Sequence, residues 1–135
     1  MALTEASPRN RTVTAAGPKF KITLAGTCIA GDLLGYSSGW KRALATVGTA
    51  IQAKLIALEG GISGDVIEVC REAIISGFTS GTEGGLLYLE EGAGVGGGYT
   101  ETAPSTTGDV NTIIGYILSA ATVFAAPSVR AGSVA

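Results

Sequence analysis

The stretch TIIGYILSAATVFAA, residues 112–126, decides the fold class of this chain. Its β-branched, aromatic and leucine side chains form two runs that are separated by the small residues 119–121. This is the pattern of two short strands joined by a tight turn. The surrounding residues 110–129 carry no charge, and a membrane-spanning helix would need about 20 mostly apolar residues. Polar residues and Pro127 interrupt the stretch, so the sequence predicts a buried β-hairpin.

Short apolar runs bounded by turn residues continue this pattern toward the N-terminus. In residues 19–24 apolar side chains alternate with Lys and Thr, which predicts a strand with one solvent-facing side. Residues 41–58 fit both a helical stripe and a strand. We favour a strand over about 50–58, and the choice between helix and strand stays open. Further strands are predicted at 33–34, 66–75 and 86–89.

The dipeptide Gly-Asp precedes an apolar run at three places in the chain. These are residues 31–32, 64–65 and 108–109, and their unequal separations argue against a sequence repeat. Glycine accepts a positive φ, and the aspartate carboxylate accepts hydrogen bonds from nearby backbone N–H groups, so the pair favours a tight turn. With the strands above, these turns predict a mainly β fold. We expect a small β-barrel or sandwich of about seven or eight short strands, with room for one short helix.

The chain divides into three parts. Residues 1–17 are polar and Thr-rich, and they are predicted to be an extended N-terminal arm without its own core, which either frays or becomes ordered on a partner. Residues 18–126 are predicted to form a single β-rich domain, and residues 127–135 a C-terminal tail. A chain of 135 residues is long enough to bury one core without a metal or a disulfide network.

Composition excludes several classes of function. The chain has no His, which rules out His-based metal sites and the Ser-His-Asp and Cys-His catalytic groups. Its net charge of −2 does not suit a nucleic-acid partner, because such affinity depends on neutralising phosphates. We therefore expect a protein that is not an enzyme, with no catalytic, cofactor-binding or metal-binding residues, and with no nucleic-acid or membrane partner.

One glycine motif resembles a nucleotide site. Residues 92–97 match G-x-G-x-x-G, but a dinucleotide site also needs a helix directly after the loop. Pro104 and its neighbours oppose such a helix, so we interpret the motif as a glycine-rich loop. The adjacent acids Glu90 and Glu91 would point to opposite faces of a strand, which argues against a catalytic pair.

The cysteines and the tryptophan are interpreted as structural residues. Cys28 and Cys70 match no metal or redox spacing and are expected to be buried free thiols, although the sequence leaves open whether they pair. Trp40 is expected to anchor the core or an interface, which are the usual places of a single tryptophan in a small β domain.

A series of motifs follows in a characteristic order along residues 28–127. They are Gly31-Asp32-Leu33-Leu34-Gly35-Tyr36, Gly39-Trp40, Gly64-Asp65-Val66, Gly85-Leu86-Leu87-Tyr88-Leu89 and the stretch from Pro104 to Leu118. In this order they resemble the small decoration proteins, also called cement or head-stabilisation proteins, of tailed bacteriophages. The chain departs from that pattern at Leu86, where proline is common, and at the glycine run 92–98, which looks like an insertion.

The resemblance implies a small β-rich barrel that forms trimers or other clusters on the outside of an assembled icosahedral head. It implies the major capsid protein as partner, stabilisation of the head by bridging capsid subunits, and a place on the virion exterior after synthesis in the host bacterial cytoplasm. The alternatives are another phage structural component, such as a head fibre, tail or baseplate protein, and a small β-barrel ligand-binding module. The lack of His and of a convergent polar cluster argues against the ligand-binding module.

Overall fold

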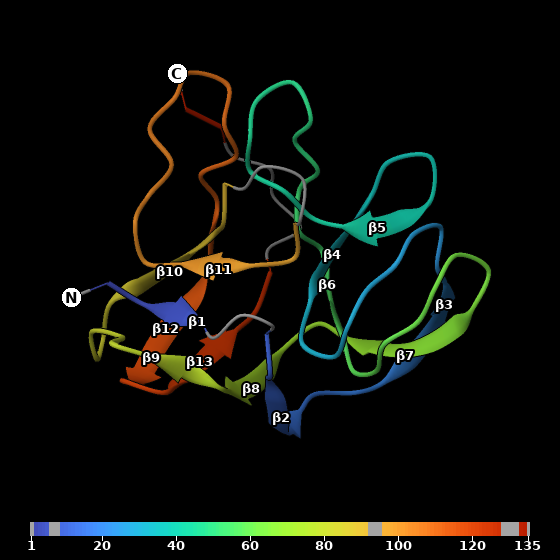
Figure 1. Cartoon of the computed structure of the whole chain (residues 1–135), viewed down its shortest axis with the longest axis horizontal. Helices are drawn as coiled ribbons and strands as arrows, with labels where there is room; N and C mark the ends of the chain where they lie inside the picture. Colours follow the sequence, from blue (N-terminus) through green and yellow to red (C-terminus); the bar gives the residue numbers. More distant parts are fainter. Residues whose placement is uncertain (1, 6–8, 92–95, 128–132, 135) are drawn as a thin grey trace.

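The computed structural model describes residues 2–5, 9–91, 96–127 and 133–134. In this part of the chain the fold is all β, with strands numbered β1 to β13 and no helix (Figure 1). The prediction of a mainly β fold is confirmed, with more strands than expected and without the short helix among the described residues. The strands are β1 (Thr4–Glu5), β2 (Thr12–Ala16), β3 (Phe20–Thr23), β4 (Leu33–Tyr36), β5 (Trp40–Arg42), β6 (Leu55–Ala57), β7 (Val66–Cys70), β8 (Ala73–Ser76), β9 (Phe78–Thr79), β10 (Leu86–Leu89), β11 (Tyr99–Thr100), β12 (Ile113–Ser119) and β13 (Thr122–Ala125).

The strands form two large sheets and one small pair, β1 with β9. The six-stranded sheet has the order β11-β10-β12-β13-β8-β2, and the five-stranded sheet has the order β3-β7-β6-β4-β5. In the described residues neither sheet closes into a barrel. The strands of the six-stranded sheet contain no Asp, Glu, Lys or Arg, so we call it the apolar sheet. The strands of the five-stranded sheet contain Lys21, Lys41, Arg42 and Glu68, so we call it the charged sheet.

The predicted hairpin is confirmed as the pair β12–β13. Tyr116 lies opposite Phe124, and the chain turns between Ser119 and Thr122 as the sequence predicts. Gly115 has a φ of +153°, and a Cβ atom at this position would come within 2.0 Å of the Phe124 carbonyl oxygen. The hairpin therefore needs glycine there.

The prediction of one continuous strand over residues 66–75 is wrong. The structure divides it into β7, which belongs to the charged sheet, and β8, which belongs to the apolar sheet. Within β7 the adjacent residues Val69 and Cys70 face different clusters of the core, as alternation in a strand requires. Past the bend, Ala73 and Ile75 of β8 belong to the main core, whereas Ile67 and Val69 of β7 belong to the second core. The exposed residues Arg71 and Glu72 occupy the bend. Strands β3 and β2 pair with β7 and β8, so one bent ribbon crosses both sheets.

Buried side chains form two clusters. The main core contains the inner side chains of the apolar sheet, together with Leu33 and Ile56 of the charged sheet and Leu3 and Phe78 beside them. The second core lies on the other side of the charged sheet. Strands β4 and β6 contribute to both clusters, which explains why they are short runs buried at nearly every position.

The first 17 residues take part in both small and large sheets. Strand β1 pairs with β9, and β2 forms an edge of the apolar sheet. Leu3 is 6% exposed and lies in the main core, and the side chain of Arg11 is fully buried. Ser133, in the segment predicted as a tail, makes a bridge to Val110. The described ends of the chain therefore contact the body of the fold.

Two other predictions are corrected in detail. Residues 41–58 contain no helix, and the predicted strand over about 50–58 is limited to β6, with a separate bridge between Leu44 and Ile51. In the strand predicted at 19–24, Leu24 is buried but Phe20 is 43% exposed. Phe20 lies next to the bend of the ribbon, at an edge of the charged sheet, where no second layer covers it.

The three Gly-Asp turns share one local geometry. In each turn the glycine has a positive φ, and the aspartate N–H donates to the carbonyl three residues earlier. The φ values are +85° at Gly31, +96° at Gly64 and +93° at Gly108. The Asp32 and Asp65 carboxylates also accept from the backbone N–H three residues earlier, each at 2.9 Å. The prediction that Asp satisfies backbone donors in these turns is confirmed for both residues.

Candidate interaction surface

Asp32 is the centre of a buried ion-pair cluster between the two large sheets. The Gly-Asp turn before β4 positions this side chain, which is fully buried. Its carboxylate accepts from Arg11 Nη1 at 2.5 Å and from Arg42 Nε at 2.7 Å. Gly97 packs against another side of the carboxylate, since a Cβ atom added there would come within 2.8 Å of it.

The cluster also holds the N-terminal segment. Arg11 Nε and Nη2 donate to the two carboxylate oxygens of Glu5 at 2.6 and 2.9 Å. Arg9 donates to Glu90 Oε1 at 2.9 Å and to the Gly96 carbonyl at 2.7 Å. We define the ion-pair cluster by its three arginines and three carboxylates: Glu5, Arg9, Arg11, Asp32, Arg42 and Glu90. Its formal charges balance.

Electrostatics indicate a structural role for this cluster. Burial alone would lower the pKa of Arg11, but the hydrogen bond to Glu5 and the neighbouring charges raise it, so the guanidinium stays charged. Arg11 also lies over the ring of Tyr99, 5.1 Å from its centre, and the Tyr99 hydroxyl donates to the Gly31 carbonyl at 2.6 Å. For the Tyr99 hydroxyl, burial raises the pKa, so the hydroxyl keeps its proton. The three nitrogens of the Arg11 guanidinium all donate to the carboxylates of Glu5 and Asp32, which favours a fixed clamp.

The cysteines and the tryptophan lie where the sequence analysis placed them. Cys28 and Cys70 are free and buried, and burial raises the pKa of Cys28 to about 11. Burial also raises the pKa of Cys70. The two thiols therefore do not pair. Trp40 packs against the second core and meets Tyr36 edge to face, with ring centres 5.3 Å apart.

The acidic residues of the glycine-rich region have separate surroundings. Glu90 pairs with Arg9, and partial burial raises the pKa of Glu90. A hydrogen bond with Asp109 raises the pKa of Glu91 and lowers that of Asp109. Most of the G-x-G-x-x-G motif, residues 92–95, lies outside the described residues. Among the described residues no group of three or more His, Cys, Asp or Glu side chains could hold a metal ion.

The outer side of the apolar sheet carries apolar side chains where polar ones are usual. An antiparallel sheet with one solvated side normally alternates apolar inward and polar outward residues. In β10 and β12 the inward residues Leu87, Ile114 and Ile117 are buried as expected. The outward residues are also apolar. The large ones and their exposed fractions are Leu86 (47%), Ile113 (49%), Tyr116 (45%) and Leu118 (36%).

These outward side chains line up across the sheet. Strand pairing places Leu86 opposite Tyr116, Tyr116 opposite Phe124, Phe124 opposite Ile74, and Ile74 opposite Ala15. The rings of Tyr116 and Phe124 lie 5.2 Å apart. With a strand spacing of about 4.8 Å, the row is ~19 Å long. We define the exposed face by this row and its outward neighbours Tyr88, Ile113 and Leu118.

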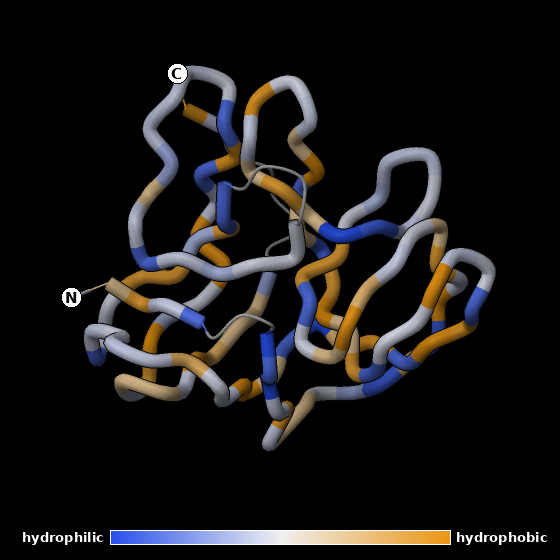
Figure 2. The backbone as a smooth tube through the Cα atoms, in the orientation of Figure 1, coloured by the Kyte–Doolittle hydropathy of each residue, from blue (hydrophilic) through white to orange (hydrophobic). Residues whose placement is uncertain are grey.

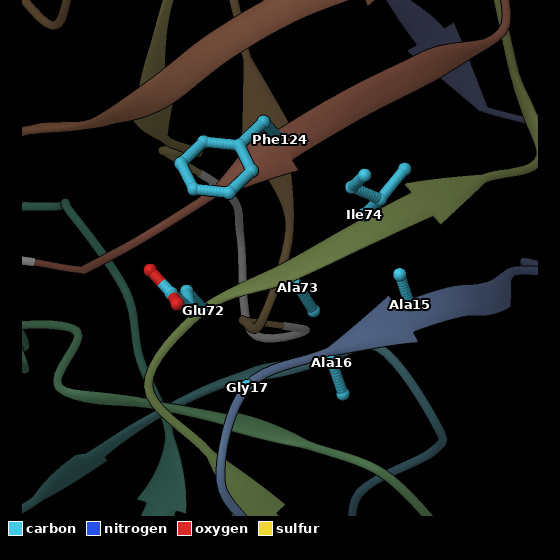
Figure 3. A pocket seen from close by; sticks show the side chains of 7 residues that line it. All are labelled: Ala15, Ala16, Gly17, Glu72, Ala73, Ile74 and Phe124. Atoms are coloured by element: carbon cyan, nitrogen blue, oxygen red, sulfur yellow. The ribbon is translucent and has the colours of Figure 1, made fainter.

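The exposed face is uneven. Its β10–β12 half carries the large side chains, whereas its β8–β2 half carries a hollow of about 190 Å³. Figure 3 shows Phe124, Ile74 and Ala15 on the outer side of the strands at this hollow, and Ala73 and Ala16 on the opposite side. Among the residues that line the hollow only Glu72 is charged, and it lies just before the start of β8.

The charged sheet has a different surface. In Figure 2 its strand β5 is hydrophilic, in agreement with Lys41 and Arg42 in that strand. Large apolar side chains are exposed here too: Tyr36 is 58% exposed and contacts Trp40, whereas Val66 and Phe20 lie beside charged residues. Val66 is 59% exposed next to the exposed Asp65, and Phe20 is 43% exposed between Lys19 and Lys21. Scattered exposure of this kind is normal for a protein surface.

No family model, curated protein or solved structure matches this chain. The described residues contain no helix that is long and apolar enough to cross a membrane. Residues of the exposed face and of the ion-pair cluster were not identified as a site from the sequence. The signal for the exposed face is that residues 113–118 are apolar at outward as well as inward positions. The signal for the ion-pair cluster is that residues 5–11 contain three charged side chains, in a chain in which only 15% of residues are charged.

Proposed function

We propose that this chain is a capsid decoration protein, which binds the exterior of an assembled phage head and stabilises it. The ordered motifs of residues 28–127 support this proposal through their resemblance to the small decoration proteins of tailed bacteriophages. The structural observation that carries it is the exposed face. A contiguous apolar sheet surface without charged strand residues is typical of a protein that functions inside an assembly.

The proposed mechanism is stabilisation by binding to the assembled state. A protein that binds the shell but not its dissociated subunits shifts the equilibrium toward the shell, by roughly 2.7 kcal/mol per site when the free protein is at 100 times its dissociation constant. Linked copies gain further affinity, because the second and third contacts become intramolecular. The partners in this proposal are the major capsid protein and other copies of this chain, with the trimer as the cluster that the resemblance implies.

The ion-pair cluster fits a structural rather than a catalytic role. It fixes the N-terminal segment and both large sheets in one arrangement, so the exposed face is presented as a rigid surface. A fixed surface loses little conformational entropy on binding, which favours tight association with another molecule of the assembly. The resemblance implies a small barrel, whereas the described strands form two large open sheets that share the main core.

Cosedimentation with assembled heads tests this function. The purified full chain is mixed with heads that lack decoration protein, and we expect it to pellet with them and to raise the temperature at which they release DNA. The control is the same titration with dissociated capsid protein, which we expect not to bind. Failure to pellet with heads, or equal binding to dissociated subunits, would contradict the proposed function.

Deletion of residues 1–17 is not a clean test of attachment. The sequence suggests an arm that could be removed while the rest stays folded. In the structure the deletion removes Arg11 from its buried contact with Asp32 and removes β2 from the edge of the apolar sheet. We expect this deletion to destabilise the fold, because it leaves a buried carboxylate with fewer partners.

A further inference from the structure

We propose that the exposed face of the apolar sheet is an interface between copies of this chain, and that another copy covers it before the protein meets a shell. The inference rests on the proposed function for the role of the assembly, and it names the partner that covers this face. The inference also implies that the major capsid protein binds a different surface, because a face that is covered by another copy is not available to it.

Charge favours a second copy as the occupant. Where a charged patch meets the same patch of another copy, like charges come together and oppose association. The exposed face avoids this cost, since the strands that form it contain no charged residue. The strands therefore bring no charged side chain into a contact between two such faces, and Glu72, which lines the hollow, lies just before the start of β8 rather than within the row.

The shape of the exposed face also favours a second copy of the chain as its partner. One half of the face carries the protruding side chains of Leu86 and Tyr116, and the other half carries the hollow lined by Ala15, Ile74 and Phe124. The hollow and the exposed side chains lie on one row across five strands, so the face has a raised half and a hollow half. The protruding half of one copy can enter the hollow half of another, with Tyr116 placed against small and aliphatic side chains.

Residue type supports an interface over incidental exposure. Aromatic residues are enriched at interface centres and charged residues are depleted there. The middle of the row contains the aromatic pair Tyr116 and Phe124, whose ring planes are tilted by 35° to each other. A free protein with this row in water would also tend to associate nonspecifically. Association between copies covers the row as soon as two molecules meet, whereas a shell covers it only after head assembly.

Sedimentation velocity of the purified full chain, without capsids, tests the inference. We expect wild type to sediment as assemblies of two or more copies rather than as a 13.4 kDa monomer. Tyr116→Glu places a charge at the centre of the face, and we expect it to raise the dissociation constant roughly 100-fold. The matched control is Val66→Glu, which introduces the same charge at an exposed apolar residue of the charged sheet. We expect the control to associate as wild type does.

Folding of the variants is checked by circular dichroism and by a cooperative thermal transition. If Tyr116→Glu fails to fold, Leu86→Glu replaces it, because Leu86 is 47% exposed at the end of the row. A monomeric wild type, or an assembly that withstands both face variants, would overturn the inference. So would dissociation of Val66→Glu to the same extent as Tyr116→Glu.

Capsid binding separates this inference from the proposed function. Self-association of wild type without binding to heads would leave the inference standing and contradict the proposed function. Binding of single copies to heads, with the exposed face in contact with the shell, would support the function and overturn the inference.

Discussion

The two large sheets are built from the same kind of strand and yet present opposite surfaces. Both are antiparallel and both bury one side in the main core. The charged sheet contains Lys21, Lys41, Arg42 and Glu68, whereas the strands of the apolar sheet contain no charged residue. The second side of the charged sheet is covered within the chain by the second core, which includes Leu34, Leu55 and Val69. Among the described residues no such core covers the second side of the apolar sheet, where Leu86 and Tyr116 stay exposed. We propose that another molecule covers that side.

The largest expected effect concerns the cluster that holds the two sheets together. Asp32→Ala leaves the buried Arg11 guanidinium with one carboxylate partner fewer, and we expect it to lower the free energy of unfolding by about 3–5 kcal/mol. Asp65→Ala is the matched control, because it removes an exposed carboxylate from the same kind of Gly-Asp turn. We expect the control to cost about 1 kcal/mol. Urea unfolding measures both, and equal losses would contradict a special role for the cluster.

The next effect compares the two sides of the apolar sheet within a single strand. Leu87 is fully buried in the main core, so Leu87→Ala is expected to lower the free energy of unfolding by about 3 kcal/mol. Leu86 is the preceding residue of β10 and points outward. We expect Leu86→Ala to change the stability of the single copy by less than about 1 kcal/mol and to weaken association instead. A comparable loss of stability in both variants would show that the outer side is part of the core.

The smallest effect concerns pH. Because burial raises the pKa of Cys28 from about 9 to about 11, the thiolate forms more readily in the unfolded chain than in the folded one. The contribution of Cys28 to stability is thus fully present below pH 9 and is lost as the pH rises toward 11. We expect Cys28→Ala to reduce the loss of stability between pH 9 and pH 11, as followed by urea unfolding. Identical pH profiles for the variant and wild type would contradict this burial.

Sequence patterns predicted the hairpin, the Gly-Asp turns and the buried thiols because each depends on neighbouring residues. The break between Cys70 and Ala73 could not be predicted, since it depends on which sheet each half of the ribbon joins. The contact of Arg11 with Asp32 joins residues 21 positions apart, and no local pattern indicates it. The exposed face escaped detection for a related reason: hydropathy places Leu86 and Tyr116 in a core, and only the pairing of strands shows that they point outward.

Thiol labelling measures most directly whether the exposed face is covered. The two native cysteines are buried, so wild type provides a low background. Tyr116→Cys places a thiol at the centre of the face, and Val66→Cys places one at a similarly exposed residue of the charged sheet. We predict that, in concentrated protein, the thiol at position 116 reacts much more slowly with a maleimide than the thiol at position 66, and that dilution removes this difference. Equal rates at every concentration would contradict the account.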